Sequence, residues 1–327
     1  MLHASNFPRR RFAVVLTTAL LGLGTALTAQ AQTWPAKPVK ILVGFPGGST
    51  PDIAARVLAE SLAKTWGQPV VVENKPGASG NLAADAAAKA SDDHTVAVVI
   101  NGNLTTAKAL NPKLPFDPAK DFSLITLLAT APLVVVTTPD QPSGAAWVAK
   151  ARESANWSYG SVGIGSMGHL GMEVIKSVLG NKTMVHVPYN GNPAVLNAML
   201  GGQIQVALVP PGLAMPQAKA GKLNAVAITG AASTLAPGVP PLADLGLRMT
   251  PLEVWVGLIG PAGLSAPARA RIGSDVQAAL ADEGLRARLL AAGWEAKGGR
   301  AEDFERRVTQ ETATLGALIR DLGIKLE

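Results

Sequence analysis

The stretch Phe45-Pro-Gly-Gly-Ser-Thr-Pro-Asp-Ile-Ala-Ala-Arg56 follows an apolar run, Val39–Val43, and precedes an Ala/Leu-rich segment with helical spacing. Two glycines, two hydroxyls and a proline therefore stand where a strand should pass into a helix. Thr50 suits the N-cap and Pro51 the first helical position, which leaves backbone N–H groups at the positive end of the helix. The stretch predicts an anion-binding turn.

Short β-branched runs alternate with Ala/Leu-rich segments along the rest of the chain, which indicates an α/β fold with mainly parallel sheets. We expect strands at Lys40–Phe45, Val70–Glu73, Thr95–Ile100, Leu133–Thr137, Ser158–Ser161, Met184–Pro188, Val206–Val209, Ala225–Thr229 and Val254–Ile259. We expect helices at Asp52–Thr65, Leu82–Lys89, Ala145–Ser154, His169–Leu179, Pro193–Leu200, Gly212–Ala220, Ala266–Ala279, Glu283–Ala292 and Ala301–Leu322.

The length of 327 residues favours two domains, because single cores rarely grow beyond about 250–300 residues. Segments rich in proline and glycine at Pro139–Gly144 and Arg248–Pro251 are the expected crossings between them. We therefore expect a discontinuous first domain, residues 32–137 and 253–327, with a second domain, residues 138–252, inserted into it.

Residues 1–31 have the pattern of an export signal. Arg9–Arg11 is basic, Phe12–Leu27 is apolar, and Ala29-Gln-Ala31 is a cleavage site. An uncleaved membrane anchor is the alternative, but the apolar run is short and no positive stop-transfer flank follows it. The arginines leave both Sec and twin-arginine export open. The pattern predicts a protein of the bacterial periplasm whose mature chain begins near Gln32.

Composition argues against several classes of function. The formal charge is +6, and the three arginines of the export signal account for half of it. Because no Lys/Arg stripe interleaves with aromatic residues, nucleic-acid binding is not expected. The chain has no cysteine, which excludes a disulfide framework, a catalytic thiol and a lipid-modified N-terminal cysteine. No two histidines have metal-ligand spacing, so we expect no metal.

In open α/β sheets, ligands bind at the carboxyl ends of strands, against helix N-termini. The loops that follow the predicted strands offer glycine, hydroxyl and amide groups with almost no charge. Each loop can also be read as a turn that needs glycine for a positive φ. Two of them, Phe45–Asp52 and Ser161–His169, fall one in each expected domain. Together they favour a shared anion-binding cleft.

An enzyme is the competing class, because Gly163-Ile-Gly-Ser-Met-Gly168 matches the glycine pattern of a dinucleotide site. Such a site also needs an acid at the end of the next strand, and the run Val185–Asn190 has none. Gly47–Ser49 lacks the lysine of a phosphate-binding loop, and Gly77–Asn81 lacks the last glycine of a nucleophile elbow. A binding protein is therefore favoured over an NAD(P)-dependent enzyme, and we expect no cofactor and no catalytic residue.

Ordered segments along the mature chain match one family. They are Trp34–Val39, Phe45–Arg56, Gly67-Gln-Pro-Val-Val-Val-Glu-Asn-Lys-Pro-Gly-Ala-Ser-Gly80, Asn111–Phe122, His169–Glu173, His186–Gly191, Leu200–Ile204 and Ala220–Leu223. Through these segments the chain resembles the Bug receptors, which are the periplasmic substrate-binding proteins of tripartite tricarboxylate transporters.

The resemblance implies a two-domain periplasmic-binding-protein fold of type II, or Venus flytrap, with a two-strand hinge. It implies a small organic acid as ligand, usually a mono- or dicarboxylate, passed by a monomer to the membrane subunits of a transporter. A ligand-sensing receptor that signals to a sensor kinase is the alternative. The carboxylate is expected on the backbone amides of Gly47–Thr50 and Gly163–Ser166.

Two departures from the family pattern bear on the ligand. The paired glycines of the first loop stand one place earlier than usual, with Pro51-Asp52 where the family has Thr-Asp, and the run Val209–Pro211 lacks the usual aspartate. The second departure disfavours an amino acid. The expected ligand-binding residues are Phe45, Pro46, Gly47, Gly48, Ser49, Thr50, Asp52, Asn101, Ser161, Gly163, Gly165, Ser166, His169, Tyr189 and Pro210.

Overall fold

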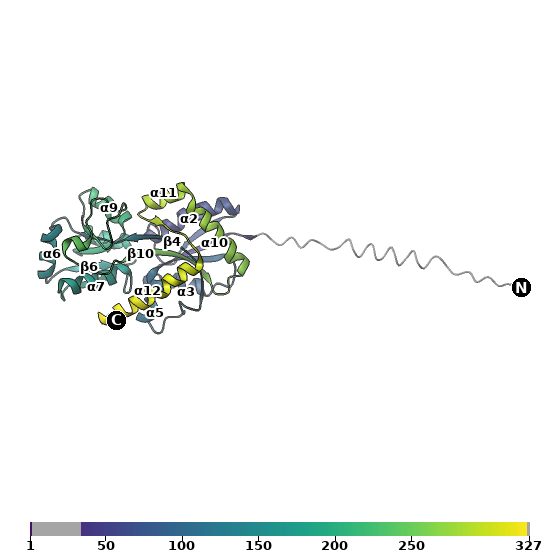
Figure 1. Ribbon diagram of the computed structural model, residues 1–327, viewed down its shortest axis with the longest axis horizontal. Helices are drawn as coiled ribbons and strands as arrows, with labels where there is room; N and C mark the ends of the chain where they lie inside the picture. Colours follow the sequence, from purple (N-terminus) through teal and green to yellow (C-terminus); the bar gives the residue numbers. More distant parts are fainter. Residues whose placement is uncertain (2–33, 326–327) are drawn as a thin grey trace. The chain divides into compact units, whose positions relative to one another are not determined.

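The computed structural model describes residue 1 and residues 34–325, so the predicted export signal lies outside the described residues. The chain divides into a short unit, Met1–Ala36, and a compact unit, Lys37–Glu327, which holds the sheets and helices (Figure 1). In the part of the chain that the structure describes, no helix is long and apolar enough to span a membrane.

Two mixed sheets organise the compact unit. The first has the strand order β11-β4-β10-β3-β1-β2, and the second has the order β7-β6-β8-β5-β9. The strands are β1 (Val39–Val43), β2 (Val70–Asn74), β3 (Thr95–Ile100), β4 (Phe122–Pro132), β5 (Val134–Thr137), β6 (Ser158–Ser161), β7 (Val185–Pro188), β8 (Val206–Val209), β9 (Asn224–Ile228), β10 (Glu253–Pro261) and β11 (Glu295–Ala296).

Helices cover both sheets, and each sheet with its helices is called a lobe. The first lobe carries α2 (Thr50–Trp66), α3 (Asn81–Ala88), α4 (Asn101–Thr105), α5 (Ala107–Leu110), α10 (Ala266–Ala281), α11 (Glu283–Ala291) and α12 (Ala301–Asp321). The second carries α6 (Gly144–Glu153), α7 (Met167–Leu179), α8 (Asn192–Leu200) and α9 (Pro211–Lys219). Short 3₁₀ turns occupy Ala78–Gly80 and Leu242–Leu245.

The C-terminal helix α12 packs directly on strand β10. Phe304 of α12 and Trp255 of β10 are both fully buried, and their rings meet edge to face at 5.2 Å. A Cβ at Gly257 would lie 2.2 Å from the Phe304 ring, so only glycine lets this ring approach the strand. The end of the chain is thereby fixed to a strand in the middle of the first sheet.

Two chain segments connect the lobes. β4 continues through Leu133 into β5 of the second sheet, and Leu252 leads back into β10 of the first. Thr229 ties the two segments together, because its hydroxyl accepts the Leu133 N–H at 3.0 Å and donates to the Leu252 carbonyl at 2.6 Å. The Thr229 N–H donates to the Leu133 carbonyl at 3.0 Å. These contacts define the hinge.

Most predicted elements lie within about two residues of the observed bounds, but two predictions are wrong, and four observed strands and helices, β4, β11, α4 and α5, were not predicted. β4 was not expected, because Phe122–Pro132 is a long apolar run without a clear period. The sheets are mixed rather than mainly parallel, since β4 leaves the first lobe and β10 returns to it in the opposite direction. The chain crosses at Leu133 and not at Pro139–Gly144, because Val134–Thr137 already pairs within the second sheet. The domain limits themselves remain predictions.

We expect Thr229→Val to lower the free energy of unfolding by about 1–3 kcal/mol, because it removes the partners of a buried N–H and a buried carbonyl at nearly constant volume. Urea denaturation measures the change. Thr229→Ser keeps the hydroxyl and should lose less than half as much. Equal losses for the two variants would show that the methyl group, and not the hydrogen bonds, supports the hinge.

Candidate ligand-binding cleft

A cavity of about 30 Å³ lies between the lobes, which is space for about one water-sized group. The loops that follow β1, β6, β7 and β8 form most of its wall, and the hinge residues Leu133 and Val254 complete it. Among the described residues that line it, none carries a charge. The full lining is Phe45, Ser49, Thr50, Pro51, Ile100, Leu133, Val162, Ser166, Met167, Gly168, Asn192, Leu208, Pro210 and Val254.

Four helices begin at this cavity. The N-caps of α2 and α7 are Ser49 and Ser166, the N-cap of α9 is Pro210, and α8 begins at Asn192. Each helix N-terminus carries roughly half a positive charge and N–H groups without intrahelical acceptors. The site thus has positive potential without a cationic side chain. The helix after the opening stretch begins at Thr50, so its N-cap is Ser49 and not Thr50 as predicted.

Ser49 presents a buried hydroxyl to the cavity. Its residue is 1% exposed, and its Oγ has no hydrogen-bond partner among the described residues. It does not cap its own helix. Leaving such a group unsatisfied costs about 1–3 kcal/mol, so a ligand oxygen that accepts this hydrogen bond recovers that energy.

Asp52 shapes the first loop from within and does not line the cavity. Its carboxylate accepts hydrogen bonds from the Gly48 N–H at 2.9 Å and from Asn74 at 2.8 Å, and it pairs with Arg56 at 2.9 Å. Burial by itself would raise the pKa of Asp52, but the hydrogen bonds from Arg56, Asn74 and Gly48 outweigh it and hold the pKa below its usual range. The carboxylate of Asp52 therefore accepts hydrogen bonds inside the first loop and does not face the cavity.

Several backbone amides expected to hold the ligand already have acceptors. The Gly48 N–H donates to Asp52 and the Ser49 N–H to the Pro46 carbonyl. In the second loop, the N–H groups of Gly163, Gly165 and Ser166 donate to Ser161 Oγ, His169 Nδ1 and the Gly163 carbonyl. Each loop therefore uses these five N–H groups to hold its own turn, and the expectation that the loop amides bind the carboxylate stays a prediction.

The second loop also contacts the first lobe. A Cβ at Gly163 would lie 2.0 Å from the Ser79 hydroxyl, and Thr106 Oγ1 donates to the Gly165 carbonyl at 2.9 Å. Ser79 and its neighbour Ala78 both have positive φ, 56° and 49°, which is unusual for residues with a side chain. The cleft is therefore closed at this edge by loop-to-loop contact.

Two histidines pack behind the second loop. The rings of His169 and His186 are 4.3 Å apart, and Tyr159 stacks on His186 at 4.9 Å. Ser161 Oγ lies 2.7 Å from His186 Nε2, and the Gly165 N–H donates to His169 Nδ1 at 3.3 Å. Burial lowers the pKa of both histidines to about 4. Both rings are neutral at neutral pH and support the loop from behind.

Of the expected ligand-binding residues, five line the cavity: Phe45, Ser49, Thr50, Ser166 and Pro210. Asn101 instead donates from Nδ2 to the Glu253 carbonyl at 3.1 Å, which ties the first lobe to the hinge strand. Gly163 and Tyr189 line a separate groove of about 450 Å³ at the rim of the cleft. Pro46, Gly47, Gly48, Asp52, Ser161, Gly165 and His169 lie in the same two loops outside the cavity lining.

Sequence reasoning missed two kinds of lining residue. Pro51, Val162, Met167, Gly168 and Asn192 lie in or beside loops that we had singled out, so the loop signal could have found them. Ile100, Leu133, Leu208 and Val254 are apolar strand residues or lie in the hinge, and nothing in their sequence context separates them from core residues.

The chain is similar to known substrate-binding receptors in sequence and in fold. The family model described as tripartite tricarboxylate transporter family receptor matches residues 54–324. The solved structure of the periplasmic binding protein BugD is 28% identical, covers 90% of this chain and 100% of its own, and has a TM-score of 0.84.

Two further solved structures contain organic acids. Rpa4515 of R. palustris with adipate is 28% identical over 89% of this chain and 99% of its own, with a TM-score of 0.85. MatC (Rpa3494) from Rhodopseudomonas palustris with bound malate is 27% identical over 88% of this chain and 100% of its own, with a TM-score of 0.81. The predicted two-domain periplasmic-binding-protein fold is confirmed.

We expect the free energy of unfolding to fall as the pH is lowered from about 6.5 to about 4, because unfolded histidines protonate near 6.5 whereas buried His169 and His186 resist protonation until about 4. Each unit of pKa difference contributes about 1.4 kcal/mol. Urea denaturation at pH 7.5, 5.5 and 4.5 measures this loss. His186→Gln should flatten the dependence, and an unchanged slope in that variant would contradict the assignment.

Proposed function

Since the chain belongs to the tripartite tricarboxylate transporter receptor family, we propose that it is a periplasmic solute-binding protein that captures a small organic acid and delivers it to a membrane transporter. The observation that carries this proposal is the uncharged cavity where four helices begin and where the Ser49 hydroxyl has no hydrogen-bond partner among the described residues. Such a site suits a carboxylate, because helix N-termini favour anions and the hydroxyl can donate to an anionic oxygen.

Binding of the carboxylate would proceed by opening of the lobes about the hinge, because the cavity of about 30 Å³ has space for only about one water-sized group, and then by closure of the lobes around the acid. In the closed arrangement, Ser49 of the first lobe and Ser166 of the second lie at one cavity, and contacts such as Thr106 to Gly165 seal its edge. Exclusion of water lowers the local dielectric, which strengthens the attraction of the helix ends for the anion. The chemistry needs no covalent step.

The solved structures of relatives and the lining of the cavity both support an organic acid as the ligand. Two structures with this fold hold adipate and malate, which are dicarboxylates. None of the described lining residues is an acid that could pair with an ammonium group, which disfavours an amino acid. The apolar floor of Ile100, Leu133 and Leu208 gives the carbon chain of an organic acid a surface to contact.

The chain is a binding protein rather than an enzyme, as its family and structural neighbours are. The glycine pattern at Gly163–Gly168 has another explanation, because Ser79 fills the space beside Gly163 and Thr106 binds the Gly165 carbonyl. Export through the predicted signal, delivery to transporter subunits and a monomeric state remain predictions. If the partner is a sensor kinase and not a transporter, the protein would bind its ligand by the same closure of its lobes.

A thermal-shift panel of mono- and dicarboxylates, with NAD and NADP included, tests the class of ligand on the purified mature protein. We expect stabilisation by at least one organic acid and none by either dinucleotide. Stabilisation by a dinucleotide alone would overturn the proposal.

For the acid that stabilises most, we expect Ser49→Ala to raise the Kd about 10-fold or more, because a hydrogen bond to a charged group contributes about 1.5–3 kcal/mol. Isothermal titration calorimetry measures the change. Ser265→Ala is the matched control, since Ser265 is also an N-cap serine, at α10, away from the cavity. If both variants bind as the native protein does, Ser49 does not contact the ligand.

A further inference from the structure

The groove of about 450 Å³ at the rim of the cleft is lined by both lobes. The first lobe contributes the turn before α3, α3 itself, α5 and the loop that follows α5, and the second contributes Val162–Ile164 and Pro188–Asn190. Most of the lining is apolar and includes Leu82, Leu110 and Leu114. We call this space the rim groove, and the cavity of about 30 Å³ between the lobes the ligand cavity.

The ligand cavity has space for about one water-sized group, so most of an organic acid must lie in a space beside it. Two larger spaces share a lining residue with it. Met167 also lines a cavity of about 620 Å³ at the hinge, and Val162 also lines the rim groove. The body of the acid could therefore extend in either of two directions.

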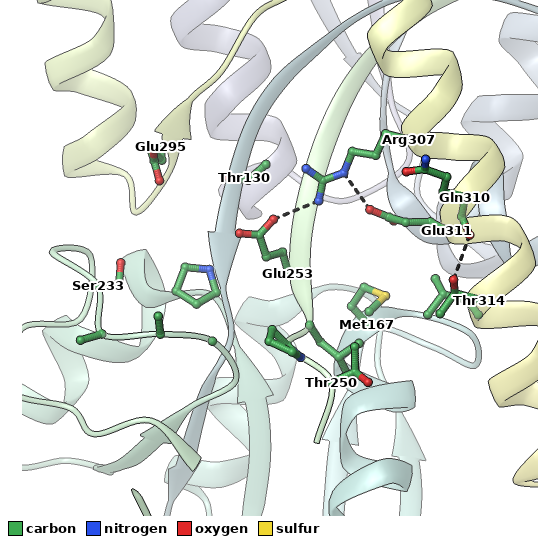
Figure 2. A pocket seen from close by; sticks show the side chains of 17 residues that line it. Thr130, Met167, Ser233, Thr250, Glu253, Glu295, Arg307, Gln310, Glu311 and Thr314 are labelled. Atoms are coloured by element: carbon green, nitrogen blue, oxygen red, sulfur yellow. Dashed lines mark hydrogen bonds and ion pairs between the residues drawn. The ribbon is translucent and has the colours of Figure 1, made fainter. Parts of the chain in front are cut away.

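The cavity at the hinge is unsuited to an organic acid. Figure 2 shows Arg307 between Glu253 and Glu311, with which it pairs at 3.0 Å and 2.7 Å. Glu295 also lines this cavity. Among the described lining residues, three carboxylates thus accompany one guanidinium that is already paired. Such a lining repels an anion and offers an apolar tail little matching surface.

The boundary between the ligand cavity and the rim groove consists of parts from different lobes. Val162 and Gly163 belong to the second lobe. In the first lobe, a Cβ at Gly80 would lie 2.9 Å from the ring of Phe45, which lines the ligand cavity, and the preceding residue, Ser79, fills the space beside Gly163. Opening of the lobes would therefore separate Ser79 from Gly163 and join the two spaces along Val162.

The rim groove favours an uncharged occupant. Among its described lining residues, Asp85 is the one charged side chain, and none is cationic. Asp85 Oδ1 has no hydrogen-bond partner among the described residues, and Oδ2 pairs with Lys89 at 2.7 Å. A carboxylate in the groove would lose water beside Asp85 without a cation to offset its charge. An apolar tail would instead cover Leu82, which is 54% exposed.

We propose that the rim groove determines the specificity of the receptor: it holds the apolar, uncharged tail of a monocarboxylate whose carboxylate lies in the ligand cavity, near Ser49. The inference rests on the proposed function and narrows it. The ligand class is an amphipathic monocarboxylate with an aliphatic or aromatic tail, preferred to a dicarboxylate of the same length. This preference differs from the adipate and malate that two solved relatives hold.

Isothermal titration calorimetry of the native mature protein with butyrate, hexanoate and octanoate tests the inference. We expect the Kd to fall by roughly tenfold or more from butyrate to octanoate, because each methylene that leaves water adds to the affinity. Hexanoate should bind roughly tenfold more tightly than adipate, the dicarboxylate of the same length. Equal Kd values for the three monocarboxylates would overturn the inference, and so would tighter binding of adipate.

Leu82→Asn tests the groove itself and should be tolerated by the fold, because Leu82 is half-exposed. We expect it to raise the Kd for octanoate roughly fivefold and to leave the Kd for butyrate unchanged, since only the longer tail reaches the groove. Leu290→Asn is the matched control, because Leu290 of α11 is 50% exposed and lies outside the rim groove and the ligand cavity. A Kd for octanoate that is the same in both variants would contradict the assignment.

Asp85→Asn tests the charge of the groove. It should lower the Kd for adipate roughly threefold or more and leave the Kd for hexanoate unchanged, because the repulsion of a second carboxylate is removed. Asp244→Asn, at an exposed position outside the rim groove and the ligand cavity, is the control for the overall change in charge. Equal effects of the two variants on the Kd for adipate would count against a second carboxylate being excluded by the groove.

The failure of this inference differs from the failure of the proposed function. If short acids bind and the length of the tail has no effect, the rim groove is rejected and the proposed function stands. If no organic acid binds, both are rejected. Octanamide has the tail without the carboxylate, and binding of octanamide as tight as that of octanoate would show that the groove takes apolar molecules without the ligand cavity, which would also overturn the inference.

Discussion

The antiparallel pair of β4 and β10 at the hinge is the constraint on which the rest of the structure depends. One strand carries the chain out of the first lobe and the other brings it back, and Thr229 binds both where they enter the second sheet. Leu133 and Val254, which belong to these two segments, line the uncharged cavity between the lobes. The same pair of segments therefore joins the lobes and forms part of the wall of the cavity between them.

In the proposed site, the orientation of the helices, and not a charged side chain, would attract an anion. A lysine or arginine in a dry cleft would have to give up its hydration before the ligand arrived, whereas helix N-termini are fixed in place by the fold and need no reorganisation. Asp52 shows how the first loop is kept rigid for this task. It is a buried carboxylate bound to the Gly48 N–H, Asn74 and Arg56, so its negative charge is balanced inside the loop and not by the cavity.

The sequence predicted elements better than it predicted contacts. The stretch Phe45–Arg56 reads correctly as a strand, a turn and a helix, because glycine, proline and the apolar spacing act locally. Local pattern does not show which N–H groups a turn uses for its own hydrogen bonds, so it could not predict that the Gly48 N–H donates to Asp52. Nor can it distinguish Leu133 and Val254, at the hinge, from ordinary core residues, because their role depends on segments that meet only in the folded chain.

The contact between Ser79 and Gly163 links two positions that are distant in the chain. Ser79 is held with a positive φ, and its hydroxyl occupies the space that a side chain at position 163 would need. A larger residue at either position must be matched by a change at the other if the lobes are still to meet. In a lineage of such receptors, the two loops would therefore have to evolve as a unit, and a loop transplanted from a relative without its counterpart would leave the cleft unable to shut.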